Sequence, residues 1–325
     1  MKTPQHWQNK NLLAYFLWPV SQLYLMGRSI HRWQRLKNQY WAGVPVISVG
    51  NITAGGAGKT PFVAALARHF AENGYQVAIL SRGYGGKHTE PTQVTDTSTA
   101  IDVGDEPVML HRQLAHLPVQ VWVGRQRPAV AARAERSGAT LLILDDGFQR
   151  DDIGRNVDIV ILRGEHPFGN GYCLPAGPLR DPLPALKRAH FAVVMNPVEG
   201  TPKYFHTPAY RLKATLENEA LKPLKNKNII AFAGLAYPDK FFGQLEKNGL
   251  KILQKIAFAD HHFYTEKDIQ NLKNQANKNS ATLVTTEKDF ARLTKRQAEN
   301  ITAIPLHLSG DDWQNITAEI EKILR

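Results

Sequence analysis

The chain has 325 residues, enough for one large or two medium domains with a buried core. Its single cysteine, Cys173, excludes an intramolecular disulfide and a multi-cysteine zinc site, and favours a reducing compartment. The 40 basic against 29 acidic residues give a net charge of +11, which favours an anionic partner. Nucleic acid, anionic lipid and a phosphorylated substrate all satisfy that condition.

The first long apolar segment, residues 12–26, mixes aliphatic and aromatic side chains and leads into a basic tail that includes Arg28 and Arg32. A membrane-spanning helix needs about 20 apolar residues, and this run is shorter and interrupted by Pro19. We therefore expect residues 1–40 to form a helical region in a membrane interface, with its aromatic rings at the headgroups and its basic tail against an anionic leaflet. A helix packed on the protein's own core is the alternative.

A short apolar run at 46–49 precedes a glycine-rich loop and the start of a predicted helix. The loop has the form G-x-x-x-x-G-K-[ST] of a phosphate-binding loop, except that Thr53 occupies the first glycine position. Backbone N–H groups would bind phosphate, Lys59 would reach the β- and γ-phosphates, and the Thr60 hydroxyl would hold Mg²⁺. The expected nucleotide-binding residues are Thr53, Ala54, Gly55, Gly56, Ala57, Gly58, Lys59 and Thr60. An ordinary glycine-rich turn before a helix is the alternative.

From residue 46 to residue 195, short apolar runs alternate with helical segments. The runs lie at 77–80, 119–123, 141–144, 157–162 and 191–195, and the helices at 61–73, 106–114 and 128–137. Near-continuous apolar strands separated by helices indicate a parallel sheet covered on both faces, with the chemistry in the loops at its carboxyl edge. We expect an α/β domain of the P-loop NTPase type at 41–205.

The pattern changes near residue 201, where prolines and a lysine-rich stretch bracket two short alternating runs. We expect linker strands at 206–228 and a second, smaller α/β lobe at 229–325. Its last strand is expected at 304–308, before a C-terminal helix from residue 311. This layout predicts a cleft between two lobes.

Two pairs of acidic residues follow these patterns. Asp145 and Asp146 end a buried strand, where an NTPase needs acids to hold Mg²⁺. Asp145 is the better metal candidate by position, and Asp146 has as its alternative a turn before Gly147. Asp105 and Glu106 lie at a strand-to-helix junction, where the residues alone favour an ordinary N-cap over a base and a metal ligand.

Two further segments carry polar residues in unusual settings. His261 belongs to an Asp-His-His sequence in the second lobe; such a pair is usually inert, but it could orient an Asp from the other lobe when the cleft closes. The segment 167–184 is rich in Gly and Pro and too long for a simple turn, which indicates a functional loop. Arg180 in this loop could bind a phosphate.

Several motifs occur together in one order along the chain. They are 49–53 leading into 55–61, 81–85, 104–107, 145–149, 169–171 with 174–180, 260–262 and 285–289. Together they resemble the tetraacyldisaccharide 4'-kinase family, the lipid A 4'-kinases of Gram-negative bacteria. The resemblance covers almost the whole chain and accounts for Thr53, since this family carries Thr at that position.

The resemblance implies a P-loop kinase that moves the γ-phosphoryl group of ATP, with Mg²⁺, onto the 4'-hydroxyl of tetraacyldisaccharide 1-phosphate to give lipid IVA. It implies a location at the cytoplasmic face of the bacterial inner membrane, with the lipid substrate and an anionic membrane surface as partners. We expect a monomer that binds no nucleic acid.

The resemblance also implies roles for individual residues. Asp105 would be the catalytic base, partnered by His261 and assisted by Lys59, which reverses the cap and inert interpretations above. The implied metal site comprises Thr60, Glu106, Asp145 and Asp146, and the implied substrate residues are Gln149, Asn170 and Arg180. Two positions depart from the family pattern: Arg150 stands where a His is usual, and Asn156 where an Asp is usual.

Other P-loop functions remain as alternatives. A GTPase or metallochaperone needs a guanine-reading Asn-Lys-x-Asp, whereas Lys288 and Asp289 are adjacent in the nearest stretch. A nucleic-acid-dependent ATPase would explain the net charge but not the apolar N-terminal segment.

Overall fold

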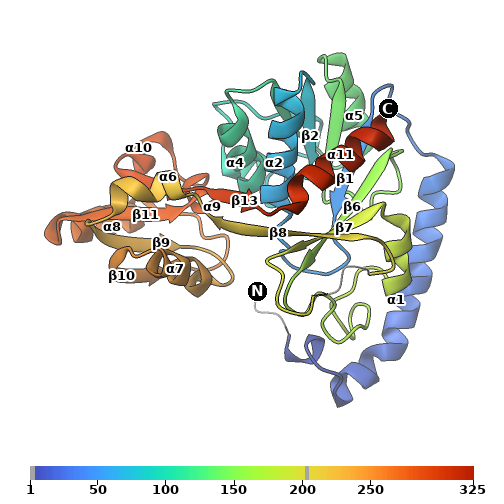
Figure 1. Ribbon diagram of the computed structural model, residues 1–325, viewed down its shortest axis with the longest axis horizontal. Coiled ribbons are helices and arrows are strands. Elements are labelled where there is room, and N and C mark those ends of the chain that lie inside the picture. Colours follow the sequence, from blue (N-terminus) through green and yellow to red (C-terminus); the bar gives the residue numbers. More distant parts are fainter. Residues whose placement is uncertain (1–3, 202–204) are drawn as a thin grey trace.

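The computed structural model describes residues 4–201 and 205–325. Figure 1 shows a large and a small α/β lobe joined by two extended strands, with one long helix along the side of the large lobe that lies away from the small one. The expected fold class, a mainly parallel α/β sheet with a smaller second lobe, is confirmed.

The large lobe is built on a nine-stranded sheet in the order β13-β8-β7-β6-β1-β5-β2-β4-β3. Neighbouring strands from β8 to β4 pair in parallel, and the two edge strands pair antiparallel. The strands are β1 (Val46–Gly50), β2 (Val77–Ser81), β3 (Thr92–Gln93), β4 (Val119–Val123), β5 (Leu141–Asp145), β6 (Val157–Arg163), β7 (Phe191–Met195), β8 (Ala209–Leu216) and β13 (Leu306–Ser309).

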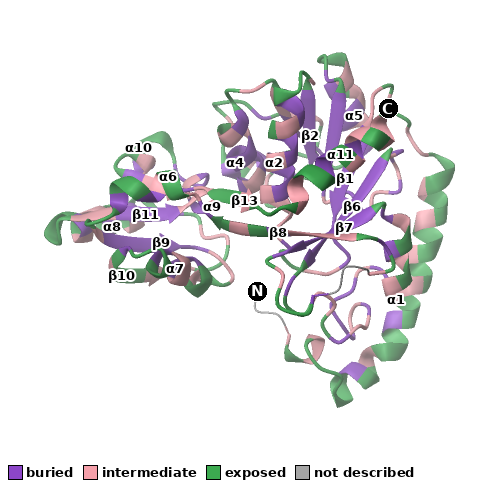
Figure 2. Ribbon diagram, viewed as in Figure 1, coloured by how far each residue is buried: buried purple, intermediate pink, exposed green. Residues whose placement is uncertain are grey.

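Helices cover this sheet on both faces. They are α1 (Leu12–Lys37), α2 (Lys59–Glu72), α3 (Ala100–Val103), α4 (Asp105–Leu114), α5 (Arg127–Arg136) and α11 (Asp312–Leu324), with 3-10 turns η1 (Gln5–Trp7) and η2 (Leu183–Arg188). On one face Phe62 and Phe70 of α2 are fully buried against the strands, each contributing about 1.5–3 kcal/mol. Val130 of α5 packs on the opposite face, and the central strands β1, β2, β5 and β7 are buried throughout (Figure 2).

The small lobe has a four-stranded parallel sheet in the order β10-β9-β11-β12. Its strands are β9 (Asn228–Ala233), β10 (Lys251–Ala257), β11 (Ala281–Thr286) and β12 (Ile301–Ile304). Its helices are α6 (Asn218–Leu221), α7 (Pro238–Lys247), α8 (Glu266–Lys278), α9 (Glu287–Phe290) and α10 (Lys295–Ala298), with the 3-10 turn η3 (Lys222–Leu224).

The chain returns to the large lobe at its end, which differs from the expected boundaries. The single strand expected at 304–308 is two strands, β12 and β13, which lie in different sheets on either side of Pro305. Proline has no N–H to donate and interrupts strand pairing at this point. Ile316 and Ile320 of α11 then pack in the large-lobe core. The compact small lobe therefore ends before 325, and β8, expected within a linker, is a full strand of the large sheet.

Helix α1 lies on the large lobe through several polar side chains, together with the buried Ala14 and the partly buried Leu25. Arg28 and Arg32 form ion pairs of 3.1 and 3.2 Å with the fully buried Asp151. The Ser21 hydroxyl donates to the Cys173 carbonyl over 2.8 Å, and the Tyr24 hydroxyl donates to the Arg180 carbonyl. Arg28 and Arg32 thus have partners within the protein, while contact of the basic tail with an anionic leaflet stays a prediction.

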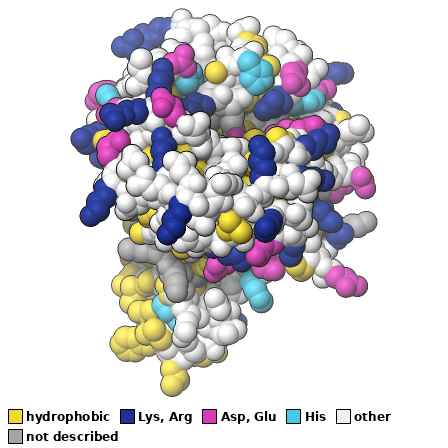
Figure 3. All heavy atoms as spheres, turned by 90° about the vertical axis from the view of Figure 1, so that its left-hand side faces the viewer, with side chains coloured by type: hydrophobic (Ala, Val, Ile, Leu, Met, Phe, Trp, Pro, Cys, Tyr) yellow, Lys and Arg dark blue, Asp and Glu magenta, His cyan; other side chains and the backbone are white. Residues whose placement is uncertain are grey.

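The other side of α1 presents apolar side chains to solvent. The exposed ones are Leu12, Leu13, Tyr15, Phe16, Trp18, Val20, Leu23, Met26, Ile30, Trp33 and Leu36. Figure 3 shows hydrophobic side chains gathered at the lower end of the molecule, at the level of the N-terminal end of α1 in Figure 1. Among the helices of the described residues, none is long and apolar enough to cross a membrane.

Candidate active site

The glycine-rich loop links β1 to α2 at the carboxyl edge of the large sheet. Gly55 and Gly58 have φ of +103° and +82°, left-handed values that a residue with a Cβ adopts at a cost. Gly58 is the N-cap of α2, so the unpaired N–H groups of the first helical turn lie at the loop. The strand, loop and helix expected of a phosphate-binding loop are all present.

Asn51, to which the sequence analysis gave no role, holds this loop in shape. It is fully buried, and its side-chain amide donates to the carbonyls of Thr53 and Gly55 over 2.8 and 3.2 Å. Its oxygen accepts a hydrogen bond of 3.1 Å from Lys59 Nζ. Arg163 donates to the Gly56 carbonyl from the next strand. The ammonium group of Lys59 is thus positioned before any phosphate arrives.

The acids at the end of β5 lie beside the loop because β5 pairs with β1, with Val49 opposite Asp145. Asp145 is buried, and burial together with the negative charge of Glu106 raises its pKa to about 7. Asp146 has a φ of +57° and accepts ion pairs of 3.0 Å from Lys59 and 3.1 Å from Arg180. Burial would raise the pKa of Asp146, but these two cations hold it below its usual range.

The base proposed by resemblance, Asp105, lies at the junction of the lobes. It is buried and is the first residue of α4, while the N-cap position belongs to Gly104, so the cap interpretation does not apply. Its Oδ2 lies 2.9 Å from His261 Nδ1, a residue of the small lobe. The same oxygen accepts hydrogen bonds from Nε and Nη2 of Arg292 over 2.8 and 2.6 Å.

This setting keeps Asp105 ionised. Burial alone would raise its pKa, but the hydrogen bond from His261 and the positive charges of Lys288 and Arg292 hold that pKa well below its usual range. The His261 backbone has a φ of +58°, and its ring contacts the edge of Tyr84. The structure thus brings together the Asp and His that the sequence placed 156 residues apart.

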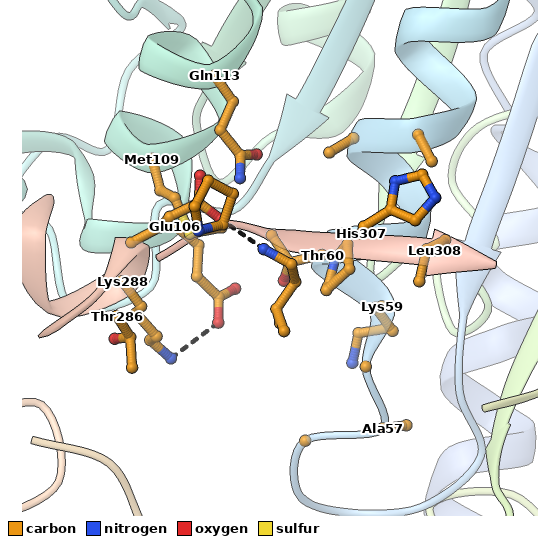
Figure 4. A pocket seen from close by; sticks show the side chains of 18 of the residues that line it. Ala57, Lys59, Thr60, Glu106, Met109, Gln113, Thr286, Lys288, His307 and Leu308 are labelled. Atoms are coloured by element: carbon orange, nitrogen blue, oxygen red, sulfur yellow. Dashed lines mark hydrogen bonds and ion pairs between the residues drawn. The ribbon is translucent and has the colours of Figure 1, made fainter. Parts of the chain in front are cut away.

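Glu106 faces a second cation from the small lobe. Its Oε1 lies 2.9 Å from Lys288 Nζ, and Figure 4 shows this pair in the same opening as Lys59 and Thr60. Lys288 is adjacent to the Asp289 that was compared with a guanine-reading motif, and nothing in the sequence indicated that it faces Glu106. Lys288 and Arg292, four residues apart, therefore bring two positive charges to the Asp105–Glu106 pair.

These groups line one cleft of about 1880 Å³ between the lobes. Its lining includes Gly55, Gly56, Ala57, Gly58, Lys59, Thr60, Asp105, Glu106, Asp145, Asp146, Arg180, His261 and Lys288. Gln149 and Asn170 are outside this lining. Gln149 donates to the Asn51 carbonyl, and the buried Asn170 amide donates to the carbonyls of His6 and Ala176. Both side chains join parts of the chain, and their expected contact with substrate has no support in this geometry.

The oxygen atoms beside the loop suit Mg²⁺ bound together with the nucleotide phosphates, and not a metal ion coordinated by protein side chains alone. Among the residues described, no group of three or more His, Cys, Asp or Glu side chains could hold an ion. Mg²⁺ usually takes one or two carboxylates and completes its shell with phosphate oxygens and water. The Asp145 and Glu106 charges disfavour one another, a repulsion that a divalent cation would relieve. Asp146 pairs with Lys59 and Arg180, and Glu106 pairs with Lys288, so either acid would exchange a cation partner for the metal ion.

Arg150, at the position where the resembling family usually has His, points elsewhere. Its Nη2 donates to the Arg125 carbonyl over 3.0 Å and to Asp152 Oδ2 over 2.9 Å. It does not belong to the cleft lining. Asn156 accepts from the Val46 backbone N–H, beside the start of β1.

Comparisons with known proteins identify the family of the chain. A family model described as tetraacyldisaccharide-1-P 4'-kinase matches residues 13–325. Tetraacyldisaccharide 4'-kinase of Nitrobacter winogradskyi is 39% identical over 93% of this chain and 90% of that protein. The same-named protein of Paramagnetospirillum magneticum is 35% identical over 99% of both.

A solved structure is similar as well. The crystal structure of LpxK from Aquifex aeolicus in complex with ATP has a TM-score of 0.80 and 28% identity, and covers 97% of this chain and 100% of that one. Family model, relatives and structure coincide over nearly the full length, including both lobes. The chain belongs to the tetraacyldisaccharide-1-P 4'-kinase family.

Proposed function

We propose that this protein transfers the γ-phosphoryl group of ATP to the 4'-hydroxyl of tetraacyldisaccharide 1-phosphate, giving lipid IVA. The observation that carries the proposal is the meeting, in one cleft, of Lys59 and Thr60 from the phosphate loop with the Asp105–His261 pair. This arrangement occurs in a chain whose family description names that substrate and whose solved relative binds ATP.

The phosphate loop would bind the triphosphate. Lys59 now contacts Asp146 and Asn51. An incoming phosphate would compete with Asp146 for this ammonium group, and Asp146 would keep Arg180 as its partner. Thr60, Glu106 and Asp145 are the oxygen donors that would hold Mg²⁺, which supplies neutralisation of the phosphate charge.

Asp105 would accept the proton of the attacking 4'-hydroxyl. A sugar hydroxyl is a weak acid, so its proton leaves late and the carboxylate mainly orients it for in-line attack. His261 holds the carboxylate through Oδ2 and would stabilise its orientation. Because Asp105 and His261 come from different lobes, this part of the site forms only when the lobes lie together.

Helix α1 would hold the enzyme on the membrane that contains the lipid substrate. Its apolar face is exposed, whereas Arg28 is paired with Asp151 and Asp181, and Arg32 with Asp151. Binding in the interface, without crossing, would place the cleft near the headgroups of the inner membrane's cytoplasmic face. One chain supplies both walls of the cleft, so the proposal needs no second subunit.

The test is phosphate transfer to the lipid. Purified protein, radiolabelled ATP, Mg²⁺ and tetraacyldisaccharide 1-phosphate are combined in mixed detergent micelles, and the lipid is separated by thin-layer chromatography. We expect one phosphate to be added, with Lys59→Met lowering kcat at least about 10²-fold and the surface variant Lys255→Met active. Lipid that stays unchanged, in a preparation that binds ATP, would refute the proposal.

A further inference from the structure

We propose that Arg292, a residue of the small lobe, is a positioning residue for phosphoryl transfer. It holds one oxygen of Asp105 so that the other can face the acceptor hydroxyl. This inference rests on the proposed function, because it requires Asp105 to act on the acceptor. Arg292 lies in the segment after β11, and neither the phosphate loop nor the Asp105–His261 pair accounts for it.

The two oxygens of Asp105 have different surroundings. Oδ2 accepts from Arg292 Nε, Arg292 Nη2 and His261 Nδ1 over 2.8, 2.6 and 2.9 Å. Within the described parts of the chain, the hydrogen bond to Oδ1 comes from the Glu106 backbone N–H over 2.9 Å. Asp105 lines the cleft. Oδ1 thus retains the capacity to accept a proton, while Oδ2 is already saturated.

Arg292 is itself rigidly held. Its side chain is 1% exposed, and Nη1 donates to Asp289 Oδ1 over 2.8 Å and to the Gly234 carbonyl over 3.0 Å. Asp289 in turn accepts from the Tyr264 hydroxyl and from the Gly234 N–H. The guanidinium plane is therefore fixed by the small lobe on one side and fixes Asp105 on the other.

A carboxylate without such a partner would be poorly oriented, because the terminal torsion of Asp is broad and roughly two-fold. General-base help needs the accepting oxygen within hydrogen-bond reach of the hydroxyl, and a misplacement of about 1 Å can cost about 10²-fold in rate. Lys288 differs from Arg292: it is partly exposed, it contacts Glu106, and it does not contact Asp105 Oδ2 among the described bonds. Orientation of the base therefore depends on Arg292 rather than on positive charge in general.

The first measurement compares Arg292→Met and Arg292→Lys in the micelle assay. We expect Arg292→Met to lower kcat for lipid phosphorylation about 10- to 100-fold while the KM for ATP stays within about two-fold. Arg292→Lys retains the charge without the planar fork, and should recover part of the lost kcat. An unchanged kcat in Arg292→Met would overturn the inference, whereas an inactive wild-type protein would instead refute the proposed function.

The decisive measurement is a double-mutant cycle with Asp105→Asn. If Arg292 acts through Asp105, then Asp105→Asn/Arg292→Met should have the same kcat as Asp105→Asn within about two-fold. A further ten-fold loss in the double variant would overturn the inference. Arg292→Met also takes the ion pair from the buried Asp289, in the single and in the double variant alike, so urea denaturation of both variants is measured beside kcat to show that they are folded.

Arg112→Met is the matched control. Arg112 is another cation at the contact between α4 and the small lobe, where it donates to the Phe290 carbonyl over 3.1 Å without touching Asp105. The kcat of the Arg112→Met variant should stay within about two-fold of the wild-type value. A loss equal to that of Arg292→Met would show that cohesion of the lobes, and not the position of Asp105, sets the rate.

Discussion

Membrane binding by the exposed face of α1 is open to a direct test. Phe16 and Leu23 are 78% and 64% exposed, and their spacing of seven residues puts them on one side of the helix. The test is a double variant in which both residues are replaced with aspartate. Because neither side chain is part of the core, the fold should persist while the apolar face is lost.

The size of the effect follows from the exposed fractions. Full burial of a Phe or Leu side chain contributes about 1.5–3 kcal/mol, so the exposed parts of these two contribute about 1 to 2 kcal/mol each. Together they give about 2 to 4 kcal/mol, which is a loss of about 30- to 1000-fold in partitioning onto lipid.

Co-sedimentation with phosphatidylethanolamine–phosphatidylglycerol vesicles measures this partitioning. A double variant at two other exposed apolar positions, Ile101→Asp with Leu253→Asp, is the control and should bind as wild type does. Wild-type binding by the Phe16/Leu23 variant, or equal loss in the control, would refute the assignment of the membrane face to α1. Added salt should weaken binding less than the aspartates do, since Arg28 and Arg32 already have protein partners.

Two further substitutions test buried carboxylates, one at the cleft and one beneath α1. Asp105→Asn should lower kcat by about 10²- to 10⁴-fold, the range for lost general-base help. The affinity for ATP, measured by calorimetry, should not change. Near-normal turnover would show that Asp105 is not the general base. Asp151→Asn leaves Arg28, Arg32 and Arg188 facing a neutral group. We expect it to lower the free energy of unfolding, measured by urea denaturation, by about 3–5 kcal/mol. Unchanged denaturation would mean that these ion pairs do not hold α1.

The central strands of the large sheet were predictable because they are buried on both faces, unlike β8 and β13. Residues 141–144 and 191–195 are continuous apolar runs, and such runs separated by helices have few other interpretations. The phosphate loop was predictable for a related reason: its groups are contiguous, so the spacing of Gly58, Lys59 and Thr60 already determines the local geometry. Helix and strand ends differed from the expected ones by one or two residues, because hydrogen bonding, and not the side-chain pattern, determines where an element ends.

The contacts between lobes were not predictable in the same way. The Asp105–His261 contact was expected through the resemblance to the family. Lys288 and Arg292 reach the start of α4 only because the two lobes are packed together, and the local sequence carries no signal of that packing. The path of the chain at Pro305 was not predictable for the same reason. A run of alternating residues indicates a strand, but it does not specify which sheet the strand joins.

Polar residues in functional-looking loops proved ambiguous for a physical reason. Asn170 lies in the Gly- and Pro-rich loop; its amide joins two parts of that loop, by donating to the Ala176 carbonyl and accepting from the Tyr172 N–H, and donates to the His6 carbonyl before α1. The adjacent backbone pairs with the phosphate loop, through Ala54 N–H to the Pro178 carbonyl and Arg180 N–H to the Ile52 carbonyl. A loop that supports two other segments needs as many hydrogen-bonding groups as one that binds a ligand, and composition alone does not separate the two.

The charges of α1 show how such an ambiguity affects function. A basic tail after an apolar helix normally indicates contact with anionic lipid, yet here Arg28 contacts both Asp151 and Asp181 inside the protein. These ion pairs fix the rotation of α1 about its own axis, and that rotation turns the apolar side chains outward. If α1 binds the membrane as proposed, the arginines would serve that binding indirectly, by orienting its apolar face.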